Sequence, residues 1–317
     1  MKYLNLSKKL LGPMMVVLVF SSCKTLDYYK EAVTYFSQAA ELEVRQKSGE
    51  MNATNLTTLE ELYAVGPSTP LQDTSSAKLY REASEHISKA LSKPTKLKNS
   101  DYNLMGNAIC LQSLAAWRLG NTQEALSKQK DALEELVQKP TQKTPEDERD
   151  ITLMTALPAL VDLEMAYDSM IVFRKELGAK VLAVKGASEV DRKALFDQLQ
   201  AHYRKFIVGE DTESGIVLQA ITHLEKSKTK AGPKHKIQSY ILLSQLTGMN
   251  TWALEFSEID NAARLLKLRK EDSPIGRWLE KQYEGYKMIR DAHLVTLEKM
   301  LPKGKADPTY ISWKKRL

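Results

Sequence analysis

Apolar positions recur every three or four residues along most of the chain, whereas the alternating runs typical of strands are few. Ala, Leu, Glu, Lys and Gln are abundant, and these residue types favour the helix. The pattern therefore predicts an all-α fold. The expected helices cover residues 26–47, 75–92, 101–119, 122–138, 146–177, 189–207, 213–228, 234–247, 251–269 and 274–300.

Local signals predict where several of these helices begin and end. A hydroxyl cap followed by proline predicts helix starts after Thr144 and Ser273, and Ser188 followed by acids predicts a third. Pro158 inside the 146–177 helix should kink it or divide it in two. Glycines predict helix ends at positions 120, 178, 209, 232 and 248.

The N-terminus has the layout of a secretory signal peptide. Lys2, Lys8 and Lys9 precede an apolar run of 11 residues from Leu10 to Phe20. As a helix this run is about 16 Å long at about 1.5 Å per residue. The hydrocarbon layer of a membrane is about 30 Å thick. The run is therefore too short to span a membrane, and residues 1–22 are predicted to be a signal peptide.

The small residues Ser21 and Ser22 followed by Cys23 resemble the lipobox of bacterial lipoproteins. The resemblance implies that Cys23 becomes the lipidated first residue of the mature protein. The partner at this end is then the membrane itself, reached through the N-terminal lipid. Lys24 follows where the family often has Asp in inner-membrane lipoproteins, which favours the outer membrane, facing the periplasm. The alternative is an ordinary cleaved signal in which Cys23 is incidental.

Residues 23–317 are expected to form a helical-repeat-like domain, because no break is strong enough to separate two independent domains. The main irregular segment is 49–75. It is rich in Asn, Thr and Ser and contains Gly66, Pro67 and Pro70, so we expect an irregular insert there.

Three of the expected helices share a pattern of small residues. Ala32, Ala83 and Ala125 are each followed by Ala seven residues later and by an apolar residue eight residues later. On a helix these positions lie on one face and let a neighbouring helix approach closely. They resemble the second helix of a tetratricopeptide repeat, with Gly120 at the turn between the helices of the best-matched copy.

The resemblance implies antiparallel helical hairpins stacked as a TPR-like α-solenoid. The spacing between copies differs from the family's, since the three Ala anchors are 51 and 42 residues apart, where the repeat is 34 residues long. A generic all-helical bundle with Ala-rich helices therefore stays open as an alternative.

Charge excludes one class of partner. The whole chain has a formal net charge of +6, but residues 1–22 contribute three Lys and no acid. The remainder has 43 basic and 40 acidic residues, a net charge of +3. No nucleic-acid partner is implied.

Candidate chemistry is sparse. No two of the five His are three or four residues apart, so no helical metal site is expected. No phosphate-cradling Gly loop or Cys-x-x-Cys motif is present, and no cofactor is expected. Cys110 lies in an apolar helical pattern and is expected to be a buried small hydrophobe. His202 is expected at the surface, and the acidic run 146–148 is expected to be a solvated helix start. We expect a protein that is not an enzyme, although a site assembled from distant residues would leave no local motif.

Together these features predict a lipid-anchored cell-envelope interaction or scaffold protein that binds a protein or peptide partner. The alternative is a small-molecule-binding or accessory component of an envelope transport system. A closed pocket lined by aromatic side chains and a few polar groups would favour the alternative, and an open groove would favour a peptide.

Overall fold

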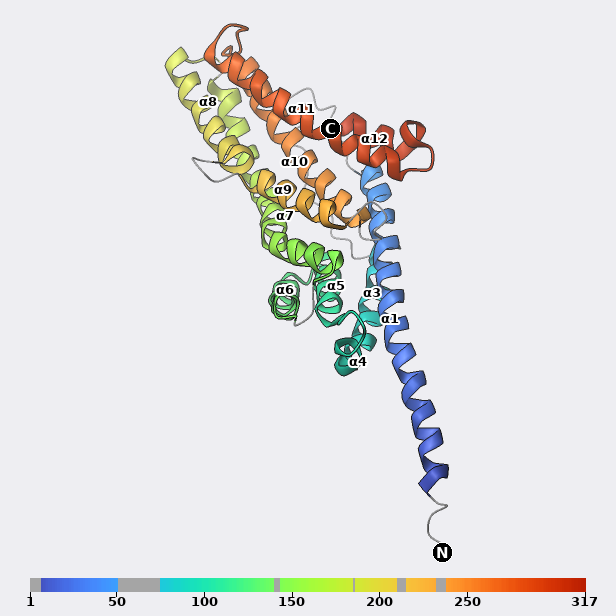
Figure 1. Ribbon diagram of the computed structural model, residues 1–317. Helices are drawn as coiled ribbons and strands as arrows, with labels where there is room; N and C mark the ends of the chain where they lie inside the picture. Colours follow the sequence, from blue (N-terminus) through green and yellow to red (C-terminus); the bar gives the residue numbers. More distant parts are fainter. Residues whose placement is uncertain (1–6, 51–74, 140–142, 185, 210–214, 232–237) are drawn as a thin grey trace, which may run out of the picture. The chain divides into compact units, whose positions relative to one another are not determined.

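The computed structural model describes residues 7–50, 75–139, 143–184, 186–209, 215–231 and 238–317 (Figure 1). Every regular element in these ranges is helical, so the predicted all-α class is confirmed. The elements are α1 (Ser7–Glu50), α3 (Ser75–Leu91), α4 (Pro94–Lys98), α5 (Met105–Arg118), α6 (Thr122–Val137), α7 (Pro145–Val184), α8 (Glu189–Tyr203), the π-helix η1 (Arg204–Val208), α9 (Ile216–Ala231), α10 (Gln238–Leu265), α11 (Pro274–Met300), the 3-10 helix η2 (Gly304–Ala306) and α12 (Pro308–Arg316). Of the insert predicted at 49–75, residues 51–74 lie outside the described ranges.

The chain divides into two compact units. Unit 1 consists of Met1–Ala40, Leu71–Thr155 and Lys230–Ile237, and unit 2 consists of Glu41–Pro70, Ala156–Thr229 and Gln238–Leu317. The backbones of α1 and α7 each run through both units.

Unit 1 contains the predicted helical hairpin. Helices α5 and α6 pack against each other and are joined by a short turn at Gly120, whose φ of 84° favours glycine. The helix end predicted at Gly120 is therefore confirmed. The Ser113 hydroxyl on α5 donates a hydrogen bond of 2.7 Å to the Ala125 carbonyl on α6.

The small-residue pattern faces the core of unit 1. The shared Ala positions on α1, α3 and α6 are fully buried. On α1 and α3 the buried Phe36 and Tyr80 rings also meet, at a centroid distance of 5.3 Å. Small side chains at these positions let the helices approach closely, as the spacing predicts. The six alanines are Ala32, Ala39, Ala83, Ala90, Ala125 and Ala132.

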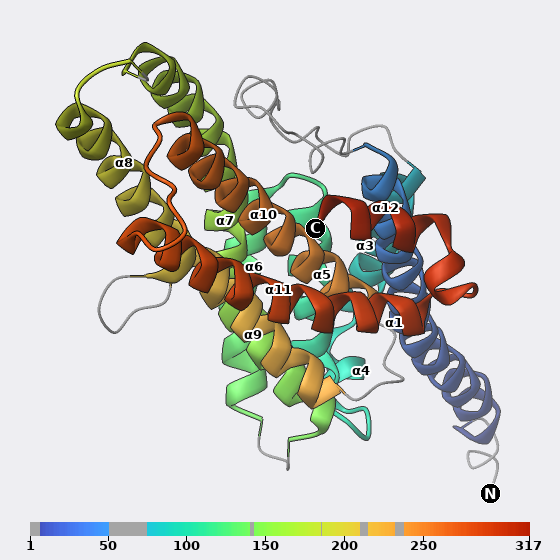
Figure 2. The ribbon, with the colours of Figure 1, turned by 90° about the horizontal axis from the view of Figure 1, so that it is seen from above.

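Unit 2 is built around α10, which lies beside α11 in both views (Figures 1 and 2). The Trp252 indole on α10 donates a hydrogen bond of 2.7 Å to the Tyr203 hydroxyl of α8. Trp252 also meets the Tyr286 ring of α11 edge-on, with centroids 5.7 Å apart. Both Trp252 and Tyr286 are buried, so these C-terminal aromatics pack in the core.

Local breaking signals were overridden at three positions. Helix α7 continues through Gly178, and α10 continues through Gly248, so these two predicted helix ends are wrong. Of the two outcomes predicted at Pro158, a kink or a division, the division does not occur. Buried residues surround Gly248, among them Leu246, Met249 and Trp252. Burial of an apolar face outweighs the cost of about 1 kcal/mol for one glycine in a helix.

Cap signals were more reliable. The Ser188 hydroxyl accepts a hydrogen bond from the Asp191 N–H at 3.2 Å, and the Ser273 hydroxyl accepts one from the Gly276 N–H at 3.0 Å. Both predicted starts are therefore confirmed. The same cap-and-proline pattern at Asp307 begins α12, which lies beyond the helices predicted from the sequence.

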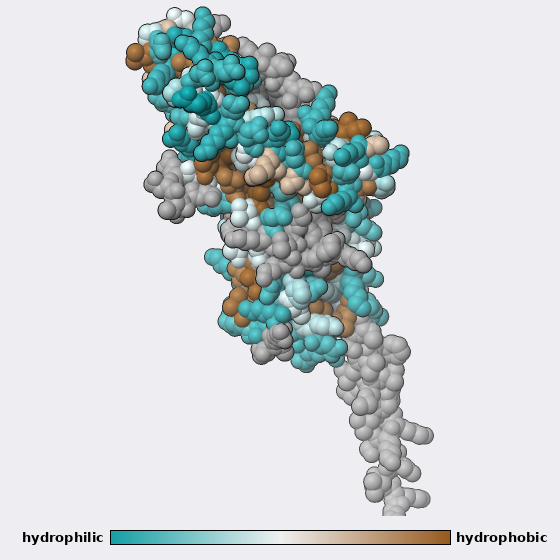
Figure 3. Space-filling model, turned by 45° about the horizontal axis from the view of Figure 1, so that its top comes forward, coloured by the Kyte–Doolittle hydropathy of each residue, from teal (hydrophilic) through white to brown (hydrophobic). Residues whose placement is uncertain are grey.

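Hydrophilic side chains cover most of the described surface on the face seen in Figure 3, and apolar residues form smaller, separate areas. Among the described residues, no helix combines the length and apolar character needed to cross a membrane.

Candidate functional site

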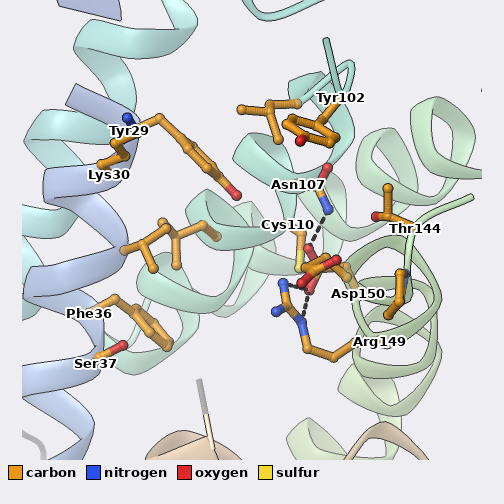
Figure 4. Close-up of a pocket in the computed structure, with 15 residues that line it drawn as sticks. Tyr29, Lys30, Phe36, Ser37, Tyr102, Asn107, Cys110, Thr144, Arg149 and Asp150 are labelled. Carbon is orange, nitrogen blue, oxygen red and sulfur yellow. Dashed lines mark hydrogen bonds and ion pairs between the residues drawn. The ribbon is translucent and has the colours of Figure 1, made fainter. Parts of the chain in front are cut away.

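A pocket of about 550 Å³ lies within unit 1 (Figure 4). Its wall comes from three segments that are far apart in the sequence: α1, the start of α5 with the loop before it, and the start of α7. The pocket contains more apolar than polar surface, with Val33, Phe36 and Leu111 among its apolar residues. The remaining lining residues are Tyr29, Lys30, Ser37, Tyr102, Leu104, Asn107, Cys110, Thr144, Pro145, Glu146, Arg149 and Asp150.

Helix α1 contributes one continuous face to this wall. Tyr29, Val33 and Ser37 are spaced four residues apart, and Phe36 lies on the same side. In Figure 4 the Tyr29 side chain reaches from α1 toward Asn107 on α5.

A buried ion pair forms the opposite wall, on the first turns of α7. Arg149 Nε and Nη2 lie 2.6 and 2.5 Å from Asp150 Oδ1, and the Asn107 amide donates to Asp150 Oδ2 at 2.8 Å (Figure 4). Burial raises the pKa of Asp150, although the Arg149 charge and the hydrogen bonds from Asn107 and Arg149 oppose this. Burial alone would lower the pKa of Arg149, but Asp150 raises it above the usual value, so the guanidinium stays charged.

A second buried pair supports the first. Lys139 Nζ lies 2.5 Å from Asp147 Oδ1 and donates to Asn107 Oδ1 at 3.1 Å, which fixes the amide that holds Asp150. The side chains of Lys139 and Asp147 are only 1% and 2% exposed. Burial alone would raise the pKa of Asp147, but hydrogen bonds from Lys139 and Thr144 outweigh it and hold the pKa below its usual value.

Asp147 also fixes the start of α7. Its Oδ2 accepts a hydrogen bond from the Thr144 N–H at 2.9 Å, and the Thr144 hydroxyl accepts one from the Asp147 N–H at 3.2 Å. This reciprocal arrangement is a capping box. The predicted helix start is therefore confirmed, but the predicted solvation of the acidic run is wrong at Asp147, because Lys139 neutralises it in the interior.

One hydroxyl in the pocket wall is buried without a hydrogen-bond partner. Ser37 is 7% exposed, and its Oγ has no partner. The Tyr29 phenol lines the same wall. Burial, followed by the charge of Asp150, raises the pKa of Tyr29 far above its usual value, so the phenol keeps its proton. Both groups can donate to and accept from a ligand.

Cys110 is free and 1% exposed, as predicted. Burial, together with the charge of Asp150, raises the pKa of the thiol well above its usual value. The thiol is therefore neutral at pH 7 and lacks the thiolate character of an activated nucleophile.

The other residues singled out in the sequence have different outcomes. Cys23 lies in the backbone range of α1, but its side chain is outside the described part of the structure. His202 was expected at the surface, and this is wrong: its side chain is 14% exposed and Nε2 lies 3.7 Å from the buried Glu255 carboxylate. The described residues contain no group of three or more His, Cys, Asp or Glu that could hold a metal ion.

Sequence reasoning missed the groups that build the pocket. One signal was present: Asp150 precedes Leu153, Met154 and Leu157 at helical spacing, and all three of these apolar residues are buried. A carboxylate on the apolar face of a helix predicts a buried partner. The partner on α5, Asn107, lies 43 residues away and carries no comparable signal.

A second hollow of about 600 Å³ lies on unit 1 between α3, α5 and α6. It is more open than the first, and more of its surface is polar. Acidic residues outnumber basic ones on its α6 side, with Asp131, Glu134 and Glu135 against Lys128.

The chain matches no protein-family model, and no curated protein or solved structure resembles it at a significant level.

Proposed function

We propose that unit 1 binds a small organic ligand in the pocket between α1, α5 and α7, and that the protein is the ligand-binding component of an envelope transport system. The single observation that carries this proposal is the buried Ser37 hydroxyl without a partner in a largely apolar pocket of about 550 Å³. A buried polar group normally has a hydrogen-bond partner. Pockets of about 300–1,000 Å³ with a few placed polar groups are typical small-molecule sites.

The ligand-binding proposal is tested by filling the pocket. Val33→Trp enlarges a lining residue of α1, and Val137→Trp makes the same change at a position on α6 that is 55% exposed. Native mass spectrometry and solvent extraction of the purified full chain should find a bound small molecule in the wild type and in Val137→Trp. Val33→Trp should lack it. Equal retention by all three proteins, each folded by circular dichroism, would contradict the proposal.

We also propose that Cys23 carries lipid and holds the protein at the outer membrane, facing the periplasm. The support is the lipobox-like sequence and the position of the pocket on the helix that follows it. Tyr29 comes six residues after Cys23, a rise of about 9 Å along a helix. The pocket would then open close to the membrane surface.

Lipidation predicts radiolabelled palmitate on the wild-type chain and none on Cys23→Ala. Cys110→Ala, which removes the other cysteine, should still incorporate the label. Label on Cys23→Ala, or none on either of the other two proteins, would refute the anchor.

The hairpins are proposed to stack as a TPR-like α-solenoid. The support is the α5–α6 hairpin with its turn at Gly120 and the buried alanines that recur on α1, α3 and α6. This architecture is the basis for a second candidate function, a scaffold that binds a protein or peptide.

The observation that favours the scaffold is the open second hollow. Its acidic α6 side would suit a basic segment of a partner. Crosslinking in intact membranes followed by purification should then recover a partner with the wild type, and Glu134→Lys should lose it. Recovery that is unchanged in Glu134→Lys would place the contact elsewhere and reject this use of the second hollow.

A further inference from the structure

We infer that the ligand of the unit 1 pocket is a neutral, elongated molecule with an apolar body and hydrogen-bonding groups toward its ends. This inference rests on the proposed function and adds the chemical class of the ligand. Three features of the described wall carry it: its balanced charge, the capped start of α7, and the order of groups along α1.

The buried charges of the wall are paired within the protein. Arg149 is neutralised by Asp150, and the exposed lining residues Lys30 and Glu146 add one charge of each sign. An anionic ligand would have to displace Asp150 from Arg149, and a cationic one would have to displace Arg149 from Asp150. Burying a charge without a counter-ion costs several kcal/mol in a protein interior. The wall therefore disfavours ions of either sign.

The start of α7 offers no spare attraction for an anion. A helix N-terminus favours negative charge because its first N–H groups lack partners. Here the Asp147 carboxylate lies on that first turn, and the Thr144 hydroxyl accepts from the Asp147 N–H. The protein supplies its own capping acceptors at this end of the helix, and the charge of the capping carboxylate is already balanced by Lys139.

The order of groups on α1 describes the length of the ligand. Tyr29 and Ser37 both line the pocket and carry hydroxyls, the one on Ser37 without a partner, with Val33 midway between them and Phe36 beside Ser37. Eight residues of helix separate Tyr29 from Ser37, a rise of about 12 Å. A ligand that lies along this face would contact apolar side chains in its middle and a hydroxyl at each end. A membrane near Cys23 would be a source of such an amphiphile.

The test compares two fluorescent probes of similar length with the full-length protein. One is 6-propionyl-2-dimethylaminonaphthalene, which is neutral and has a carbonyl acceptor, and the other is the anion 2-(p-toluidinyl)naphthalene-6-sulfonate. Probe fluorescence is assigned to the pocket only where it is lost in Val33→Trp and kept in Val137→Trp. The neutral probe is expected to bind at least about 10-fold more tightly than the anionic probe, which corresponds to a difference of about 1.4 kcal/mol in binding free energy.

The hydroxyl contact is tested with Ser37→Ala. The neutral probe should bind about 3- to 10-fold more weakly, as expected for the loss of one neutral hydrogen bond. Ser244→Ala is the matched control, because Ser244 is also 7% exposed but its hydroxyl already donates to the Tyr240 carbonyl in unit 2. It should leave the affinity unchanged.

The outcomes separate the two proposals. If Val33→Trp abolishes binding of neither probe, the pocket is not a ligand site and the proposed function fails. If the anion binds there as tightly as the neutral probe, pocket binding stands and the inference of a neutral ligand is overturned. If Ser37→Ala binds the neutral probe like the wild type, the pocket does not use the Ser37 hydroxyl and this inference is overturned too.

Discussion

Lys139→Met should destabilise unit 1 by about 3 kcal/mol at pH 7, because it leaves Asp147 as a buried charge without its cation. Lys139 and Asp147 are 1% and 2% exposed, and their charged atoms are 2.5 Å apart. Removing one member of a buried pair costs about 3–5 kcal/mol. Asn107 also loses the ammonium that its Oδ1 accepts from, which loosens the support of Asp150.

The assay is urea unfolding followed by circular dichroism. With a slope of about 3 kcal/mol per molar urea, a loss of about 3 kcal/mol lowers the midpoint by about 1 M. Lys128→Met is the control, since Lys128 and Asp131 are 3.9 Å apart and partly exposed. Exposed pairs contribute at most about 1 kcal/mol. Replacing Asp147 by Asn in the Lys139→Met background should restore part of the loss, because the buried charge is then gone.

The pH dependence gives this prediction a second test. In the wild type the pKa of Asp147 is lowered, so its ionised form stabilises the fold above its usual pKa, and this stability is lost as the pH falls through the lowered value. Without Lys139, burial raises that pKa, so the variant becomes relatively more stable as Asp147 is protonated. The penalty should therefore shrink between pH 7 and pH 4. A loss below about 1 kcal/mol at pH 7, or a penalty that is the same at both pH values, would refute the reasoning.

Two further predictions concern packing in α5. Gly106→Ala should lower the free energy of unfolding by about 1 kcal/mol, because the added Cβ would lie 2.7 Å from Leu136 Cγ. Gly285→Ala in α11 is the control: its Cβ meets nothing within 4 Å, so the free energy of unfolding should rise by about 0.5–1 kcal/mol. Both variants are compared by urea unfolding, and an equal effect of the two would count against close α5–α6 packing. Cys110 should resist iodoacetamide in the native protein and react on unfolding, because its thiol is buried and neutral. Labelling is followed by mass spectrometry, and rapid labelling of the native protein would show that the pocket wall at Cys110 opens to solvent.

The sequence predicts the features that depend on neighbours along the chain. The caps at Ser188 and Ser273 and the turn at Gly120 were found because each is specified within four or five residues. The predictions at Gly178 and Gly248 are wrong because local helix propensity does not include burial. Both glycines lie among buried apolar residues, and this packing keeps the helix continuous.

The pocket was not predicted, since its parts have meaning only after folding. Arg149 and Asp150 look like ordinary charges at a helix start, and Asn107 looks like a polar residue on an apolar helix. Lys139 follows the C-cap of α6 and precedes Pro140. Tertiary packing brings these groups within hydrogen-bond distance, which no local spacing encodes.

Because the pocket has walls from residues 29–37, 102–111 and 144–150, it exists only while those stretches are assembled. Whatever occupies it must then favour the folded chain over the unfolded one. A true occupant at 100 times its dissociation constant would add about 2.7 kcal/mol to the free energy of unfolding. The melting temperature of this protein can therefore serve as the detector in a search through compound libraries, before anything about the natural occupant is known.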